Sequence, residues 1–396
     1  MGSEMTRTRN HPGFWIVNLI VLVAFVPTLQ AQLTMGPSKG PVPADTLPLR
    51  PDMPCSAVAQ PRPDGYRVAL TPAQEKRADN LYQKSIVITA HDHCFHPDDF
   101  RDQEAGGVTV RTIKLTTDGI YWEDAKRFPI ESEVMGWEKR GRNAFGLLQE
   151  QISKSQGKIV LVKSVSDIYR VKREGKLGVI ASFEGGRPLE GKLENVGKFH
   201  RLGLRDLQIF WAVPSPLRTP DNMLTPFGLQ VIGDMNRRGI VVDLSHLSAA
   251  AFAQAMAATS KPIVVSHCGV AGVTGSKSSG TDGLGDDTIR AIAANGGSVC
   301  LHFYSGYIPA RHGPNSTVED LVDHVDYIRR LVGIDYVSLG TDYFPEKGAA
   351  WIQGAENTRG MSNVAREMVR RGFTDEEIQK VLGLNLIRVY QKVWER

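Results

Sequence analysis

The chain has 396 residues, of which 41% are hydrophobic, 23% charged and 8% aromatic. This composition is close to that of an average globular protein and excludes collagen-like, coiled-coil and wholly disordered chains. The 47 Lys and Arg residues exceed the 43 Asp and Glu residues by four, which gives a net charge of +4. Such a small excess argues against nucleic acid as a partner.

The N-terminal residues 1–31 have the pattern of an export signal. Arg7 and Arg9 precede an apolar run over residues 14–26, and the small residue Ala31 follows. The run is shorter than the roughly 20 apolar residues that a membrane-spanning helix needs. We therefore expect an exported protein, periplasmic or secreted. An uncleaved N-terminal membrane anchor is the alternative.

Residues 32–70 have the composition of a linker, because eight prolines lie between Pro37 and Pro63 among small and polar residues. Proline-rich segments of this kind form extended tethers rather than helices or sheets. The four cysteines of the whole chain are too few for a disulfide scaffold. We expect residues 71–396 to form one folded domain.

In that domain, short β-rich runs alternate with amphipathic helical stretches. The runs are 86–89, 108–114, 177–182, 206–211, 240–244, 263–266, 297–303 and 336–339, and the clearest helical stretches are 226–238, 249–259, 286–295, 318–331, 363–371 and a terminal helix over 374–394. Apolar strands separated by helices indicate a parallel sheet that is covered on both faces. Eight such runs predict an α/β fold of the (β/α)8 TIM-barrel type. A ninth run, 158–162, is interpreted as an extra strand.

Four of the ten histidines lie where apolar runs end, namely His91, His93, His246 and His267. In a parallel barrel the carboxyl ends of the strands meet at one mouth, where active sites are built. His91 and His93 are two residues apart, so in a strand they face the same side and can bind one ion. Each histidine taken alone could instead be a hydrogen-bonded structural residue.

Two carboxylates occupy equivalent places. Glu184 ends an apolar run and precedes Gly185 and Gly186, which allow close backbone approach, and Asp342 follows the last run. A set of imidazoles and carboxylates favours zinc over magnesium or calcium. Two such ions can share a hydroxide that attacks an acyl bond, while Asp342 moves a proton to the leaving amine. Taken alone, either carboxylate could cap a helix or form a salt bridge.

Three neighbouring residues are not assigned to the site. His302 would face the same mouth if the register of the run 297–303 allows it. Cys94 and Cys268 flank candidate ligands and could act as soft secondary ligands, although a free cysteine is usually a small buried residue.

Seven short motifs follow one another between about residue 71 and the end of the chain. They are Ser182–Gly186 (SFEGG), Thr225–Gly228 (TPFG), Met235–Arg237 (MNR), Val242–His246 (VDLSH), Val265–His267 (VSH), Leu339–Asp342 (LGTD) and Gly383–Val389 (GLNLIRV). In this order they resemble the membrane dipeptidase (renal dipeptidase-like) family of the amidohydrolase superfamily. The resemblance implies a (β/α)8 hydrolase with two zinc ions per chain, dipeptides as small-molecule substrates and a homodimer.

The resemblance also implies roles for individual positions. It makes His91 and His93 ligands of the first ion, Glu184 the bridge, His246 and His267 ligands of the second ion, and Asp342 the acid–base residue.

Three positions depart from the family pattern. The first motif of the family usually reads His-x-Asp, and the neutral His93 raises the formal charge of the site by one unit, which should make a bound water more acidic. Trp211 stands where the family commonly has a histidine that contacts the substrate carbonyl. Lys277 lies nearest to the position of the usual carboxylate-binding Arg and lacks its bidentate fork.

We expect Trp211 and Lys277 to contact the substrate. Because of these departures, two alternatives to dipeptide hydrolysis stay open. One is hydrolysis of other small amides or esters, such as N-acyl amino acids or cyclic amides, and the other is metal binding without turnover.

Overall fold

The computed structural model describes residues 55, 65–118, 136–211, 213–275, 280–281, 283–345 and 349–395. The expected export signal (residues 1–31) and Lys277 lie outside these residues. Among the described helices, none is long and apolar enough to cross a membrane.

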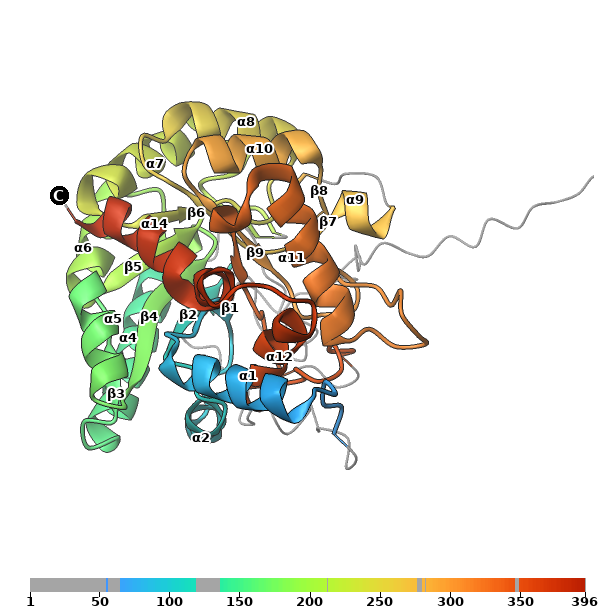
Figure 1. Cartoon of the computed structure of the whole chain (residues 1–396). Coiled ribbons are helices and arrows are strands. Elements are labelled where there is room, and N and C mark those ends of the chain that lie inside the picture. The colour runs from blue at the N-terminus through green and yellow to red at the C-terminus, as the bar shows by residue number, and fades with distance from the viewer. Residues whose placement is uncertain are drawn as a thin grey trace, which may run out of the picture. The chain divides into compact units, whose positions relative to one another are not determined.

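Within the described residues, eight strands form one parallel sheet in the order β1-β2-β4-β5-β6-β7-β9-β10. Their bounds are β1 Ile88–Asp92, β2 Val110–Thr117, β4 Leu177–Glu184, β5 Leu204–Gln208, β6 Val241–Asp243, β7 Val264–Val270, β9 Ser298–Leu301 and β10 Val337–Leu339. Backbone hydrogen bonds of 2.9 Å, from Asp342 N to His91 O and from His93 N to Tyr343 O, join β1 to the chain that follows β10. The predicted (β/α)8 barrel is therefore confirmed (Figure 1).

Two short strands lie outside this order. The ninth predicted run forms β3 (Ile159–Leu161), which pairs with the first residues of β4, whereas β5 pairs with the later residues of β4. The second, β8 (Gly283–Leu284), pairs with the end of β7 and was not predicted.

The helices surround the strands (Figure 1). Their bounds are α1 Pro72–Lys84, α2 Pro97–Ala105, α4 Trp137–Lys154, α5 Val165–Arg173, α6 Leu193–Leu202, α7 Pro226–Arg238, α8 Ala249–Ala258, α9 Ala271–Thr274, α10 Asp286–Ala294, α11 Val318–Val332, α12 Ser362–Arg370, α13 Asp375–Gln379 and α14 Asn385–Trp394. Helix α7 has clear ends: Thr225 caps it by accepting from Gly228 N, and Gly239 ends it with a φ of +72°.

The predicted terminal helix is not continuous. A π-helical turn, Lys380–Leu384, lies between α13 and α14. A Cβ atom at Gly383 would lie 2.4 Å from the Ile86 carbonyl oxygen, so this turn packs directly on the backbone that leads into β1. The interruption therefore accompanies a contact that only glycine permits.

The barrel interior contains a buried charged triad of Lys114, Asp206 and Asp243. Lys114 Nζ lies 3.0 Å from Asp206 Oδ1 and 2.8 Å from Asp243 Oδ2. Burial raises the pKa of Asp206 to about 6 even though Lys114 opposes it. At Asp243 burial also acts to raise the pKa, but Lys114 and other partners outweigh it, so the net pKa lies below the usual value. Register pairs Lys114 with Ser182, two residues before Glu184, which places the triad one layer below the strand ends.

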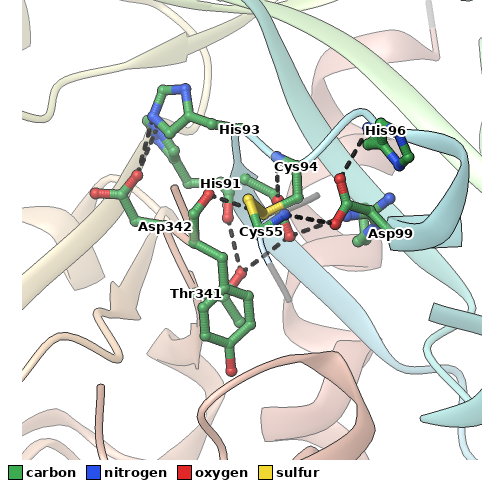
Figure 2. The surroundings of a disulfide bond; sticks show 11 residues. Cys55, His91, His93, Cys94, His96, Asp99, Thr341 and Asp342 are labelled. Carbon is green, nitrogen blue, oxygen red and sulfur yellow. Dashed lines mark hydrogen bonds and ion pairs between the residues drawn. A yellow bond between two sulfur atoms is a disulfide. The ribbon is translucent and has the colours of Figure 1, made fainter. Parts of the chain in front are cut away.

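A disulfide between Cys55 and Cys94 fastens the proline-rich segment to the barrel (Figure 2). Cys94 lies two residues after the end of β1, and Cys55 N donates to Asp99 Oδ1 at 2.9 Å. Further along the same segment, Val68 is buried and its carbonyl accepts from Arg366 at 3.0 Å. The segment that precedes α1 is thus attached to the domain at two described places.

Replacing both Cys55 and Cys94 by Ala should lower the free energy of unfolding by about 3–4 kcal/mol, because the disulfide closes a loop with a sequence separation of 39 residues in the unfolded chain. Urea denaturation measures this difference. The wild-type protein treated with a reductant should match the variant, and the variant should not respond to the reductant. Equal stability of the two oxidised proteins would contradict the expectation.

Candidate metal centre

Four imidazoles from three strands meet at the mouth of the barrel. His91 lies in β1, His93 follows β1, His246 follows β6, and His267 lies in β7. The Nε2 atoms of His91 and His93 are 3.1 Å apart, and those of His246 and His267 are 3.0 Å apart. The ring centroids of His91 and His267 are 4.2 Å apart, which joins the two pairs into one cluster.

Glu184, the last residue of β4, spans both pairs. Its Oε2 lies 3.4 Å from His93 Nε2, and its Oε1 lies 3.6 Å from His91 Nε2 and 3.5 Å from His246 Nε2. Gln208 donates to the same Oε1 at 3.2 Å. Gln208 was not predicted, and it reaches Glu184 because the two residues are register partners on β5 and β4.

The backbone after Glu184 requires glycine. Gly185 has a φ of +99°, and a Cβ atom there would lie 2.2 Å from the carboxyl carbon of Asp118. That carboxylate accepts from Gly186 N at 2.9 Å and from Arg187 N at 2.6 Å. The paired glycines therefore let a buried carboxylate fix the turn that follows the bridging candidate.

Asp342 faces the cluster from the chain after β10. Its Oδ1 lies 3.0 Å from His93 Nε2 and 3.3 Å from His91 Nε2 (Figure 2). Both Asp342 and His246 have left-handed backbones, with φ values of +51° and +63°. Such conformations cost about 1–3 kcal/mol in residues other than glycine and concentrate at functional sites.

His302, which lies directly after β9, holds the other oxygen of Asp342. Its Nδ1 accepts from Tyr304 N at 3.0 Å, so its Nε2 carries the proton. That Nε2 lies 3.0 Å from Asp342 Oδ2, and the ring stacks on Tyr307 with centroids 4.3 Å apart. Sequence reasoning left His302 out because its direction depends on a register that the sequence does not define.

The electrostatics of the cluster suit cations. Burial is the main cause that lowers the pKa of His267 to about 4 and that of His91 well below its usual value, so both rings are neutral near pH 7. Burial acts to raise the pKa of Glu184, but the His93 and His246 imidazoles outweigh it and lower the pKa. At Asp342 burial is likewise outweighed, by the imidazoles of His91 and His267 and by the hydrogen bond from His302. The neutral imidazoles of His91 and His267 beside two carboxylates belong to a donor set for divalent ions.

The spacing of the donor atoms tests whether ions fit. Ligand atoms held 2.0–2.1 Å from a tetrahedral zinc lie about 3.4 Å from one another. In the cluster, the imidazole Nε2 atoms and the carboxylate oxygens that face them are separated by 3.0 to 3.6 Å in most pairs. Two triads have ligand atoms that all lie within 4.8 Å of one another, one of His91, Glu184 and His267, the other of His91, His93 and Asp342. Asp342 Oδ1 is buried and faces the Nε2 atoms of His91 and His93 without a well-aligned donor, as expected for an oxygen that faces a cation position. The residues therefore fit a metal centre.

The alternative that the flanking cysteines are soft secondary ligands is wrong for Cys94, and the interpretation as a small buried residue is confirmed for Cys268. Cys94 cannot be a soft metal ligand, because its sulfur is bonded to Cys55. Cys268 adjoins His267 on β7, so its side chain lies on the opposite side of the strand. There it belongs to the hydrophobic core, and its Sγ lies 3.3 Å from the Cys300 carbonyl oxygen.

Of the two residues expected to contact the substrate, Trp211 lies three residues beyond β5 and is partly exposed, and Lys277 is outside the described residues.

A parallel barrel with imidazoles and carboxylates gathered at the ends of its strands is an amidohydrolase-like fold. Residues 140–395, more than half of the chain, match the sequence profile of membrane dipeptidase (peptidase family M19). The chain therefore belongs to this metallopeptidase family, as the motifs indicated. Glu184, His246, His267 and Asp342 lie inside the matched region.

Two curated relatives are named as dipeptidases. The chain is 27% identical over 254 residues to the dipeptidase tcpJ of Claviceps purpurea, which covers 62% of this chain and 58% of the relative. It is 27% identical over 234 residues to the uncharacterized dipeptidase C965.12 of Schizosaccharomyces pombe, which covers 56% of this chain and 54% of the relative. The chain thus spans less than two thirds of the length of each.

Solved structures share the fold over nearly their whole length. An amidohydrolase from Pseudomonas aeruginosa superposes with a TM-score of 0.69 at 22% identity, over 81% of this chain and 99% of that one. A metallopeptidase from Rhodobacter sphaeroides, liganded with a phosphinate mimic of the dipeptide L-Ala-D-Ala, gives 0.67 at 20% identity, over 78% of this chain and 100% of that one. At these identities the likeness establishes the fold.

Proposed function

We propose that the chain is a zinc-dependent dipeptidase that binds two Zn²⁺ ions per chain. The observation that carries the proposal is the convergence of four imidazoles and two carboxylates at the mouth of a family M19 barrel. The names of the two curated relatives support a dipeptide as substrate.

The side chains divide the work as follows. His91 and His93 would hold one ion, His246 and His267 the other, and Glu184 would bridge them, because its two oxygens face both pairs. When bound, the ions would polarise the scissile carbonyl and supply the attacking hydroxide.

Asp342 would accept the proton of the attacking water and deliver it to the leaving amine. The hydrogen bond from His302 occupies Oδ2 and directs Oδ1 toward the reacting groups. His302 thus positions the carboxylate.

The experiment that tests this function is a substrate screen of the zinc-reconstituted protein. We expect turnover of L,L- or L,D-dipeptides and none of N-acetylated dipeptides. A matched control is the Glu184→Gln variant, which retains the shape of the bridge but removes its charge. Hydrolysis of N-acyl amino acids or cyclic amides alone would replace the dipeptidase assignment by the second candidate.

That second candidate is a hydrolase of other small amides or esters. It is favoured by the indole of Trp211, which cannot accept a proton where the family commonly has an imidazole, and by the replacement of the carboxylate-binding Arg near Lys277. A metal-binding protein without turnover is the third outcome of the same screen.

A prediction on pH follows from His93. Replacing this neutral ligand by the anionic Asp lowers the formal charge of the centre by one unit. The acidic limb of kcat/KM against pH should therefore move to higher pH. His96→Asp is the control, because it adds the same charge three residues away at the cap of α2, outside the cluster. Superimposable profiles of the wild-type and His93→Asp proteins would contradict the expectation.

We also propose that the protein is exported and acts as a homodimer. The Cys55–Cys94 disulfide supports export, because such bonds persist in oxidising compartments. The mass of the N-terminal peptide of secreted protein distinguishes a cleaved signal from a retained membrane anchor. Sedimentation analysis tests the dimer.

A further inference from the structure

One serine hydroxyl contacts two of the candidate ligands on the side that faces away from the centre of the cluster. Ser266 Oγ lies 2.9 Å from His91 Nδ1 and 3.1 Å from His267 Nδ1, and all three side chains are fully buried. These Nδ1 atoms face away from the centre of the cluster, whereas the Nε2 atoms of the same rings face His93 and His246. The hydroxyl therefore touches the outer nitrogen of one ligand from each pair.

A short chain of hydrogen bonds leads from this hydroxyl into the barrel. Ser266 Oγ lies 3.2 Å from Ser245 Oγ, and Ser245 Oγ donates to Asp243 Oδ1 at 2.9 Å. The other oxygen of Asp243 accepts from Lys114 Nζ at 2.8 Å. The chain thus ends at a carboxylate that a buried ammonium group neutralises.

The number of available protons determines which group donates in each of these hydrogen bonds. The Asp243 carboxylate only accepts, so the single hydroxyl proton of Ser245 is used in the bond to it. Ser245 Oγ accepts from Ser266 N at 2.9 Å and keeps a second lone pair, so a hydrogen bond between the two hydroxyls takes the proton of Ser266. Ser266 has no second proton to give, so it can only accept from the two imidazoles, and its two lone pairs match two Nδ1–H donors.

We propose that Ser266 is a positioning residue that holds His91 and His267 as Nδ1–H tautomers, with both Nε2 lone pairs directed at the metal positions. This inference rests on the proposed two-metal function and deepens it. Because His91 is assigned to one ion and His267 to the other, a single hydroxyl supports both halves of the centre. The usual outer partner of a metal-bound histidine is a separate carboxylate, carbonyl or water for each ring.

The test is the zinc affinity of Ser266→Ala, measured by competition with a chromophoric chelator. Removing the shared acceptor leaves two buried N–H groups unpaired and frees both rings, so the affinity for both ions should fall about 10–100-fold. Ser298→Ala is the matched control, because Ser298 is also a buried strand serine, bonded to Ser338 at 2.8 Å and touching none of the candidate ligands. Its zinc affinity should equal that of the wild-type protein.

The proposal is overturned if Ser266→Ala binds both zinc ions with the same affinity as the wild-type protein. If that variant does not fold, nitrogen NMR of the histidines in the metal-free wild-type protein decides. Protons on Nδ1 of both His91 and His267 support the proposal, and a proton on Nε2 of either ring overturns it. A wild-type protein that binds no zinc would refute the proposed function, while the NMR result would still decide on the tautomers.

Discussion

The Asp342→Asn variant should hydrolyse its substrate about 10²–10⁴-fold more slowly than the wild-type protein, through kcat rather than KM, with both ions retained. The amide has nearly the shape of the carboxylate but cannot accept the proton of the attacking water. The candidate ligands are otherwise untouched, and His302 can still bond to the amide oxygen. Steady-state kinetics together with the zinc content of the same sample measure both parts of the expectation.

The control for this variant is Asp326→Asn, which alters a partly exposed carboxylate on α11 that pairs with Arg330. Its kcat should equal that of the wild-type protein. Undiminished hydrolysis by Asp342→Asn with zinc bound would show that the proton shuttle is assigned to the wrong residue. Loss of zinc together with activity would instead make Asp342 a ligand.

The Lys114→Met variant should lose about 3–5 kcal/mol of the free energy of unfolding. Methionine fills the volume of the lysine stem but leaves the carboxylates of Asp206 and Asp243 buried without their shared counter-ion. A typical domain has a stability of about 5–15 kcal/mol, so this loss is a large part of the total. Urea denaturation measures it.

The loss should depend on pH in a defined direction. Without Lys114, both carboxyls have folded pKa values above the value of about 4 in the unfolded chain, as burial already causes for Asp206. A carboxyl of this kind binds its proton more tightly when folded, so stability falls as pH rises through the interval between the two pKa values. The deficit against the wild-type protein should therefore be larger at pH 8 than at pH 5.

Lys154→Met is the matched control, because Lys154 pairs with Glu150 on the exposed face of α4. Removing an exposed pair changes stability by about 0.5 kcal/mol or less. A similar small loss in Lys114→Met, or a deficit that grows toward low pH, would show that the triad does not carry the buried charge in the way described.

Much of the fold was predictable because strand and helix patterns are local. The apolar runs predicted all eight barrel strands to within a few residues, and α7 has the bounds 226–238 that were predicted for it. The π-helical turn at Lys380–Leu384 was not predictable, because it accompanies contact with the backbone at Ile86, nearly three hundred residues away in the sequence.

The candidate site, too, was predictable from the sequence only in part. The barrel brings strand ends together, so the histidines at the ends of apolar runs could be grouped from their positions in the sequence. The partners of those residues could not, because Ser266 beneath His91 and Gln208 beside Glu184 depend on strand register. The Cys55–Cys94 disulfide was also missed, since a pairing between a proline-rich segment and a strand end has no local signal.

Anomalous diffraction from crystals of the zinc-reconstituted protein tests the central claim most directly. Two zinc peaks are expected, each about 2.0–2.2 Å from its ligand atoms. Glu184 should lie between them, with His91 and His93 on one peak and His246 and His267 on the other. A single peak, or peaks that these side chains do not contact, would contradict a two-metal centre.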